Sequence, residues 1–100
     1  MGKIIYVDID ETICYYQGER NYNLAIPYKD RIQKINKLYD EGNRIHYWTA
    51  RGTKTGEYWL GKTKEQLDAW GCKYHGLLIN KPVYDLFIDD KNINSNDFFQ

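Results

Sequence analysis

The sequence has no excess of charge of either sign, because its 14 Lys and Arg residues balance its 14 Asp and Glu residues. A nucleic-acid or anionic-membrane binder usually carries a basic excess, so we expect neither partner. No apolar stretch approaches the ~18 residues of a membrane-spanning helix, and no signal-peptide pattern opens the chain. We therefore expect a soluble, cytoplasmic protein.

Cysteine is also scarce, since the chain has only Cys14 and Cys72. They lie far apart and belong to no CxxC or His-rich motif, which argues against a zinc site and against a disulfide scaffold. We expect two reduced, buried thiols. The length of 100 residues with 42% hydrophobic content is that of a single domain spanning residues 1–100.

The most informative segment is residues 4–12, an apolar run that leads directly into Asp8, Asp10 and Thr12. Such a run is typical of a buried parallel strand, and ligands bind beyond the carboxyl ends of these strands. Side chains two residues apart in an extended chain share a face, so both carboxylates would point into one small volume. Either a cation lies between them or one of them holds a proton.

The rest of the chain alternates strand and helix patterns, which predicts an α/β layer fold with a parallel sheet. The expected strands cover 3–7, 44–48, 74–79 and 85–88, the expected helices run from Pro27 to the stop at Gly42 and over 55–70, a hairpin flap covers 13–22, and a loop or frayed tail covers 92–96. One connection is unusual. Only residues 80–84 link the last two strands, whereas a parallel crossover usually takes a dozen or more residues.

The strand expected over 85–88 ends in Asp89 and Asp90, as the first strand ends in Asp8 and Asp10. An isolated Asp pair is more often a turn or helix cap. Here two strand ends would deliver acids to one edge of the sheet, which favours a site for a cation and its ligand. Thr49 and Lys81 follow the other two strands, and each alone would be read as a strand or surface residue.

These residues occur in the order of the four motifs of the haloacid dehalogenase-like (HAD) phosphatases, which the chain resembles over nearly its whole length. The resemblance implies a compact Rossmann-like core of three α/β/α layers with a short parallel sheet, a small flap and no cap domain. The stretches Lys81–Lys91 and Trp48–Gly52 look most like the small phosphatases associated with bacterial capsular polysaccharide biosynthesis.

Phosphoryl transfer needs a nucleophile, a cation on the phosphate oxygens and a proton for the leaving group. Asp8 is the candidate nucleophile, and Asp10 the candidate general acid and base, a role that calls for a raised pKa. Mg²⁺ would be held by Asp8, by the backbone carbonyl of Asp10 that the resemblance implies, and by Asp89 as first choice or Asp90 through water. In family terms, Thr49, Ala50 and Lys81 bind the phosphate.

We therefore expect a Mg²⁺-dependent phosphomonoesterase that forms an aspartyl-phosphate on Asp8 and acts on a phosphorylated sugar or similar small metabolite. Two alternatives stay open: a nucleotide or polynucleotide-end phosphatase, and a non-catalytic phosphate-binding module. Tyr15, Tyr16 and Tyr22 on the flap could contact a sugar, although most tyrosines simply pack. A site without a cap takes a large substrate or borrows a lid from another subunit, so a homo-oligomer is also open.

Overall fold

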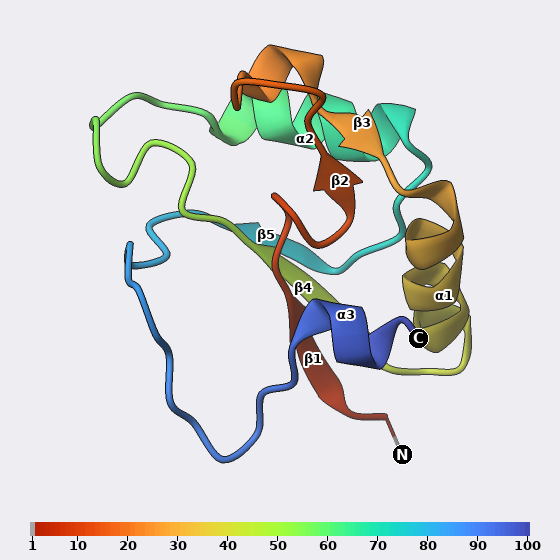
Figure 1. Ribbon diagram of the computed structural model, residues 1–100. Coiled ribbons are helices and arrows are strands. Elements are labelled where there is room, and N and C mark those ends of the chain that lie inside the picture. The colour runs from red at the N-terminus through yellow and green to blue at the C-terminus, as the bar shows by residue number, and fades with distance from the viewer. Residues whose placement is uncertain (1) are drawn as a thin grey trace.

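The computed structural model describes residues 2–100, and its central element is a parallel sheet of three strands (Figure 1). The strand order is β1 (Ile4–Val7), β4 (Arg44–Trp48) and β5 (Gly76–Leu78), so β4 lies in the middle and β1 at an edge. Parallel pairing places Ile4 opposite Arg44 and Tyr47 opposite Leu77. These are the first three strands that the apolar runs of the sequence predict.

Two helices, α1 (Lys29–Asp40) and α2 (Leu60–Ala69), pack against the sheet and bury its inward-facing residues. The core joins residues of the sheet, the helices and the first loop: Val7, Ile9, Ile13, Cys14, Ile32, Ile35, Ile45, Tyr47 and Leu67. On the other face, Ile4 and Tyr6 are 67% and 56% exposed. The described residues thus form a small α/β fold with one well-covered sheet face, whereas the sequence analysis expected helix layers on both.

The helix boundaries differ from the expected ones at their N-terminal ends. Pro27 belongs to a strand, so α1 begins only at Lys29, and α2 begins at Leu60 because residues 51–55 form a turn. The predicted stop at Gly42 is confirmed, since its φ of +98° is a left-handed conformation that glycine adopts without strain. No helix formed by residues 2–100 is long and apolar enough to cross a membrane.

The flap is formed differently from the hairpin expected over 13–22. Strand β2 (Cys14–Tyr15) pairs antiparallel with β3 (Ile26–Pro27), and a short 3-10 helix, η1 (Tyr22–Leu24), lies between them. The turn at Gly18 therefore does not join two paired arms. The partner strand lies farther along the chain because Tyr28 N–H donates to the Ile13 carbonyl and holds the two segments together.

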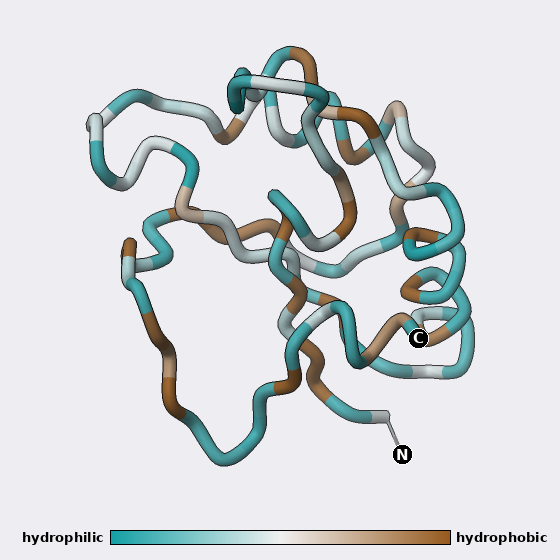
Figure 2. The backbone as a smooth tube through the Cα atoms, in the orientation of Figure 1, coloured by the Kyte–Doolittle hydropathy of each residue, from teal (hydrophilic) through white to brown (hydrophobic). Residues whose placement is uncertain are grey.

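The fourth strand expected over 85–88 is not formed. Residues 82–92 instead make a long extended loop that runs beside β1 in the opposite direction, and Figure 2 shows apolar residues along it (Figures 1 and 2). Leu86 is 75% exposed and Ile88 88% exposed. The physical reason is the five-residue connection, which is too short to return the chain to the start of the sheet.

The chain ends in a short helix, α3 (Ser95–Phe98), where a loop or frayed tail was expected. Asn94 caps this helix by accepting from Asn96 N–H. Two bonds tie the helix to α1: Lys34 Nζ donates to the Phe98 carbonyl at 2.7 Å, and Arg31 Nη2 donates to Asn96 Oδ1 at 3.1 Å. The extended loop is thus anchored at both of its ends.

Candidate functional site

A pocket of about 760 Å³ lies at the carboxyl ends of β1 and β4, the edge that the sequence predicts for the site. Asp8, Asp10, Ala50 and Lys81 contribute to its wall, as do residues of the flap and of the turn after β4. Gly52 stands in that turn with φ +81°, and a Cβ there would come within 2.0 Å of the Glu57 carbonyl oxygen. The turn therefore requires glycine at this position.

Asp8 is a partly exposed carboxylate with two polar neighbours. Its side chain is 37% exposed, Thr12 Oγ1 donates to Oδ2 at 3.0 Å, and Lys81 Nζ lies 3.3 Å from Oδ1. The lysine side chain is 16% exposed, so the pair is only partly screened by water. One face of Asp8 thus stays open to the pocket, with a positive charge beside it.

The backbone holds Lys81 in this position. Its N–H donates to the Thr49 carbonyl at 3.1 Å, and its own carbonyl accepts from Thr53 Oγ1 at 2.9 Å. Asn80 turns the chain with φ +65°, a conformation that Asn tolerates better than most residues. The predicted meeting of Asp8 and Lys81 is therefore confirmed, and it depends on the end of β4.

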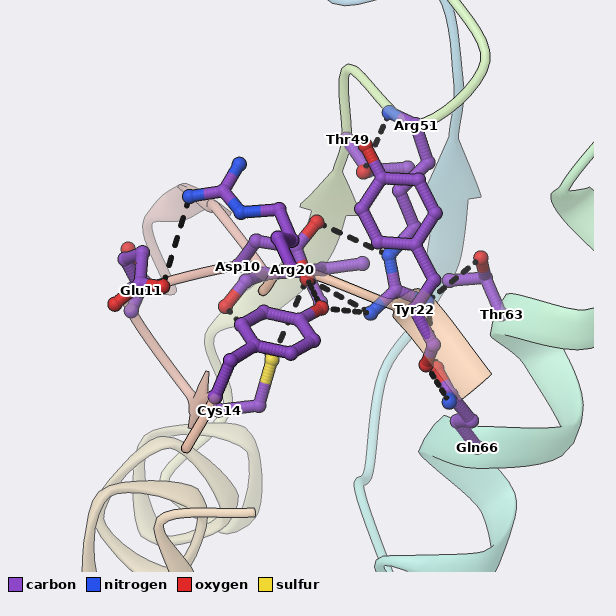
Figure 3. Close-up of polar contacts among 12 residues, drawn as sticks. Asp10, Glu11, Cys14, Arg20, Tyr22, Thr49, Arg51, Thr63 and Gln66 are labelled. Atoms are coloured by element: carbon purple, nitrogen blue, oxygen red, sulfur yellow. Dashed lines mark hydrogen bonds and ion pairs between the residues drawn. The ribbon is translucent and has the colours of Figure 1, made fainter. Parts of the chain in front are cut away.

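Asp10 differs most from expectation. Arg51 donates to both of its oxygens, from Nη2 to Oδ1 at 2.8 Å and from Nε to Oδ2 at 3.0 Å, and Tyr16 Oη and Cys14 Sγ also donate to Oδ1 (Figure 3). Burial opposes the charge, but the bonds and the positive charge of Arg51 outweigh it and lower the pKa of Asp10. The raised pKa expected for a general acid is wrong for this arrangement.

Arg51 is the site residue that the sequence analysis missed. Its side chain is fully buried, and Nη1 donates to Thr63 Oγ1 at 3.2 Å and to Gln66 on α2. The Tyr22 ring lies 4.7 Å from the guanidinium carbon (Figure 3). Its place in the turn directly after Thr49 and Ala50 was the available signal, but an arginine there is usually taken as exposed.

The two residues expected to bind phosphate beside Lys81 have different surroundings. Thr49 is buried, and its Oγ1 accepts from Arg51 N–H at 3.0 Å, so the hydroxyl shapes the turn and does not line the pocket. Ala50 does line the pocket. Of the expected phosphate ligands, Ala50 and Lys81 are brought together here and Thr49 is not.

Asp89 and Asp90 lie on the extended loop, and neither lines the pocket at the carboxyl ends of the strands, although Asp89 and Asp8 both line the groove between β1 and the loop. Within residues 2–100, no group of three or more His, Cys, Asp or Glu side chains is placed to hold a metal ion. A protein Mg²⁺ site usually uses one or two carboxylates plus substrate and water oxygens. In a single copy of the chain, Asp8 lines this pocket without Asp89 or Asp90, so the described residues do not bring together all the acids expected to hold Mg²⁺.

Of the three flap tyrosines, only Tyr22 lines the pocket. Its ring meets Trp59 edge to face at 4.9 Å between centroids. Tyr16 is engaged through its hydroxyl with Asp10, and Tyr15 packs on Tyr28 at 4.7 Å. Tyr22, Trp59 and Tyr84 are therefore the aromatic residues that a ligand in this pocket would meet.

Cys14 and Cys72 are both free thiols, as expected, but only Cys14 is buried and Cys72 is partly exposed. Burial first, and then the charge of Asp10, raise the pKa of Cys14 to about 12. A thiol with so high a pKa stays protonated at neutral pH and is a poor nucleophile. Cys14 therefore serves Asp10 as a weak hydrogen-bond donor.

No family model matches this sequence, and no curated protein matches it. The chain is similar to a solved protein, the crystal structure of an MCSG target from Vibrio cholerae. The two are 27% identical, with a TM-score of 0.82, over 99% of this chain and 88% of that one. The likeness supports the small α/β fold described above.

Proposed function

We propose that this protein is a phosphomonoesterase of the HAD type, in which Asp8 is the nucleophile. The observation that carries the proposal is the Asp8 carboxylate at the end of β1, open to the pocket and flanked by Lys81 at 3.3 Å and Thr12 at 3.0 Å. A carboxylate so placed can attack phosphorus, and the lysine can neutralise an oxygen of the entering phosphate. The resemblance of the motifs to small capsule-associated phosphatases supports the same activity.

In the first step, an Asp8 oxygen bonds to phosphorus as the bond to the ester oxygen breaks, and the leaving group departs with the electron pair. In the second step, water attacks the acyl phosphate and releases inorganic phosphate from Asp8. Asp10, which lines the pocket and is kept ionised by Arg51, would accept the proton of that water, although its lowered pKa makes it a weak base. It is poorly suited to protonate the leaving group, so esters of acidic alcohols should react fastest.

Mg²⁺ is the cofactor that the resemblance implies, and it would supply charge neutralisation at the phosphate. A test of the activity must therefore include it. We expect purified protein to hydrolyse 4-nitrophenyl phosphate with added Mg²⁺, to lose the activity in EDTA, and to regain it when Mg²⁺ is restored. Release of nitrophenolate measures the rate.

Chelated protein should keep its circular dichroism spectrum, which separates loss of the metal from loss of the fold. A protein that binds inorganic phosphate but hydrolyses none of a panel of phosphate esters would instead be the non-catalytic module. A panel on which nucleotides or 3′-phosphorylated oligonucleotides react best would favour the nucleotidase alternative.

For the substrate, we favour a phosphorylated sugar. The pocket wall carries both signs of charge, the acids Asp8, Asp10, Glu19 and Glu57 and the bases Arg20, Lys54 and Lys81. A wall of mixed charge offers no basic track for a polynucleotide backbone. The faces of Tyr22 and Trp59 offer flat, amphipathic contact of the kind that suits a sugar ring.

The Tyr22→Ala change tests this contact. We expect it to raise KM for a sugar phosphate several-fold more than KM for 4-nitrophenyl phosphate, because Tyr22 would meet the sugar and not the phosphoryl group. Tyr22→Phe should behave like the unaltered protein, since it keeps the ring. Tyr58, which is 76% exposed and does not line the pocket, provides the matched control Tyr58→Ala. Equal changes in KM for both esters would reject the sugar contact.

A further inference from the structure

Within residues 2–100, no strand pairs with the outer edge of β1. The sheet order places β4 on its other side, so the N–H and C=O groups that point outward from Ile4–Val7 are left unpaired in the sheet. Proteins usually shield such an edge with charge, proline or a covering segment, because it is a template for pairing with another strand. Here its residues Ile4 and Tyr6 are apolar and exposed.

The extended loop offers a strand that also lacks a partner. Residues 85–88 read Asp-Leu-Phe-Ile, and the last three side chains are 75%, 45% and 88% exposed. Runs of this composition are typical strand formers. An exposed apolar patch of this kind marks an interaction site in a stable protein.

Residues 85–88 cannot pair in parallel with β1 of the same chain. Lys81 is fixed at the carboxyl edge of the sheet by its bonds to Thr49 and Asp8. A parallel strand over 85–88 must start at the opposite edge, roughly 13 Å away at the rise of a strand. Residues 82–84 could scarcely span that distance, and none would be left to reverse the chain.

A groove lies between β1 and the loop. It encloses about 1160 Å³, and its walls include Ile4 and Tyr6 on one side and Leu86 and Phe87 on the other. The loop runs opposite to β1 (Figure 1). A strand lying between them, parallel to β1, would be antiparallel to the loop. A second copy of the same loop has that direction when two copies are related by a two-fold axis.

We infer that two copies of this chain exchange residues 85–88, each pairing in parallel with β1 of the other. The two loops lie antiparallel to each other at the centre, and the two three-stranded sheets join into one continuous sheet. The open edge of β1 is thereby closed in both copies.

The area available is that of a specific dimer. Each copy contributes Ile4 and Tyr6 from β1, the three apolar residues 86–88, and Ile93, which is 61% exposed. Together these side chains expose on the order of 800 Å² per copy, close to one side of a standard-size interface. Because the patch on one copy meets the same patch on the other, the contact closes as a dimer and does not propagate.

The exchange also brings acids to the pocket. With 85–88 beside Ile4–Val7, Asp89 of the partner subunit follows at the level of Asp8, and Asp90 of the partner subunit comes next. The carboxylate missing from a single copy would then come from the other copy, which would complete an oxygen-rich cation site. This consequence rests on the proposed function, whereas the exchanged sheet does not.

The first experiment measures mass by size-exclusion chromatography with light scattering. We expect the unaltered protein at twice its 12.0 kDa chain mass. The double change Leu86→Asp and Ile88→Asp should give a folded monomer, because both side chains are exposed within one copy. Leu24→Asp, at a 67% exposed position away from the groove, is the matched control and should remain a dimer. A monomeric unaltered protein, or a dimer that survives the double change, would overturn the inference.

The second experiment tests whether sites are shared between copies. Asp8→Asn and the double change Asp89→Asn with Asp90→Asn should each be inactive alone. When the two variants are co-expressed, about half of the dimers are mixed. In each mixed dimer, one of the two sites combines an intact Asp8 with an intact Asp89 and Asp90 of the partner subunit. Activity should therefore return to about a quarter of the unaltered level. No recovery in proven mixed dimers would reject the exchange of acids. If the unaltered protein hydrolyses no phosphate ester, the proposed function fails, while the mass measurement still decides on the dimer.

Discussion

Asp8→Asn is expected to lower the rate of 4-nitrophenyl phosphate hydrolysis by roughly a thousand-fold or more, which corresponds to about 4 kcal/mol of transition-state stabilisation. The amide keeps the shape of the carboxylate but cannot form the acyl phosphate. The loss should appear in kcat, with little change in KM, because the nucleophile acts mainly in the transition state. Stopped assays over a range of substrate concentrations measure both constants.

The fold should tolerate this change. Asp8 is partly exposed, so losing its ion pair with Lys81 should cost no more than about 1 kcal/mol of unfolding free energy. Asp40→Asn is the matched control, since it removes an exposed ion pair with Lys73 far from the pocket. Acid-quenched protein that retains labelled phosphate in the unaltered form, and loses it in Asp8→Asn, would identify the intermediate. Substantial turnover by Asp8→Asn would mean that another group attacks phosphorus.

Arg51→Met is expected to lower the free energy of unfolding by about 3–5 kcal/mol at pH 7. The reason is that Asp10, whose side chain is only 10% exposed, would keep its charge without its partner. Urea unfolding followed by circular dichroism measures the loss. Lys73→Met, which breaks an exposed pair with Asp40, should cost less than about 1 kcal/mol.

The pH dependence follows from the lowered pKa of Asp10. In the unaltered protein, the ionised carboxylate stabilises the fold above its unfolded pKa of about 3.9, and this contribution is lost as the pH falls through the lower folded pKa. Without Arg51, burial is the largest influence on the pKa of Asp10 and favours the protonated form, while the bonds from Tyr16 and Cys14 still favour the ionised form. The difference between Arg51→Met and the unaltered protein should therefore be largest at pH 7 and shrink below about pH 4. Adding Asp10→Asn should recover part of the loss, and a purely additive double variant would contradict the pairing.

Local pattern predicted the sheet well and the loop after it poorly. The strand at 4–7 is an apolar run and the strand at 44–48 largely alternates polar and apolar residues, while Gly42 follows the last turn of α1, so the chain near each element decides it. Residues 85–88 carry the same strand pattern but pair with nothing in one copy. Whether such a run forms a strand depends on a partner edge within reach, which is a property of the connection length and not of the run itself.

The site shows the same division. Asp8 and Lys81 lie at strand ends, and topology alone brings strand ends together, so their contact could be predicted. The bond between Arg51 and Asp10 could not, because it depends on Thr63 and Gln66 of α2 holding the guanidinium inside the protein. The chemistry of the reaction led us to expect a raised pKa for Asp10, but the buried ion pair with Arg51 lowers it.

The pairing of β1 with β4 also governs how the nascent chain can fold. Ile4 pairs with Arg44, 40 residues later, so the first strand has no partner until β4 has been made. At ~5–20 residues per second, synthesis leaves β1 without its partner for roughly 2 to 8 seconds. Closing a loop of this length costs about 3 kcal/mol of chain entropy, which the packing of α1 inside the loop helps to offset. Within the β1–α1–β4 unit, the apolar strand β1 is thus synthesised first and its partner β4 last. Several copies translated from one message would expose β1 at the same time.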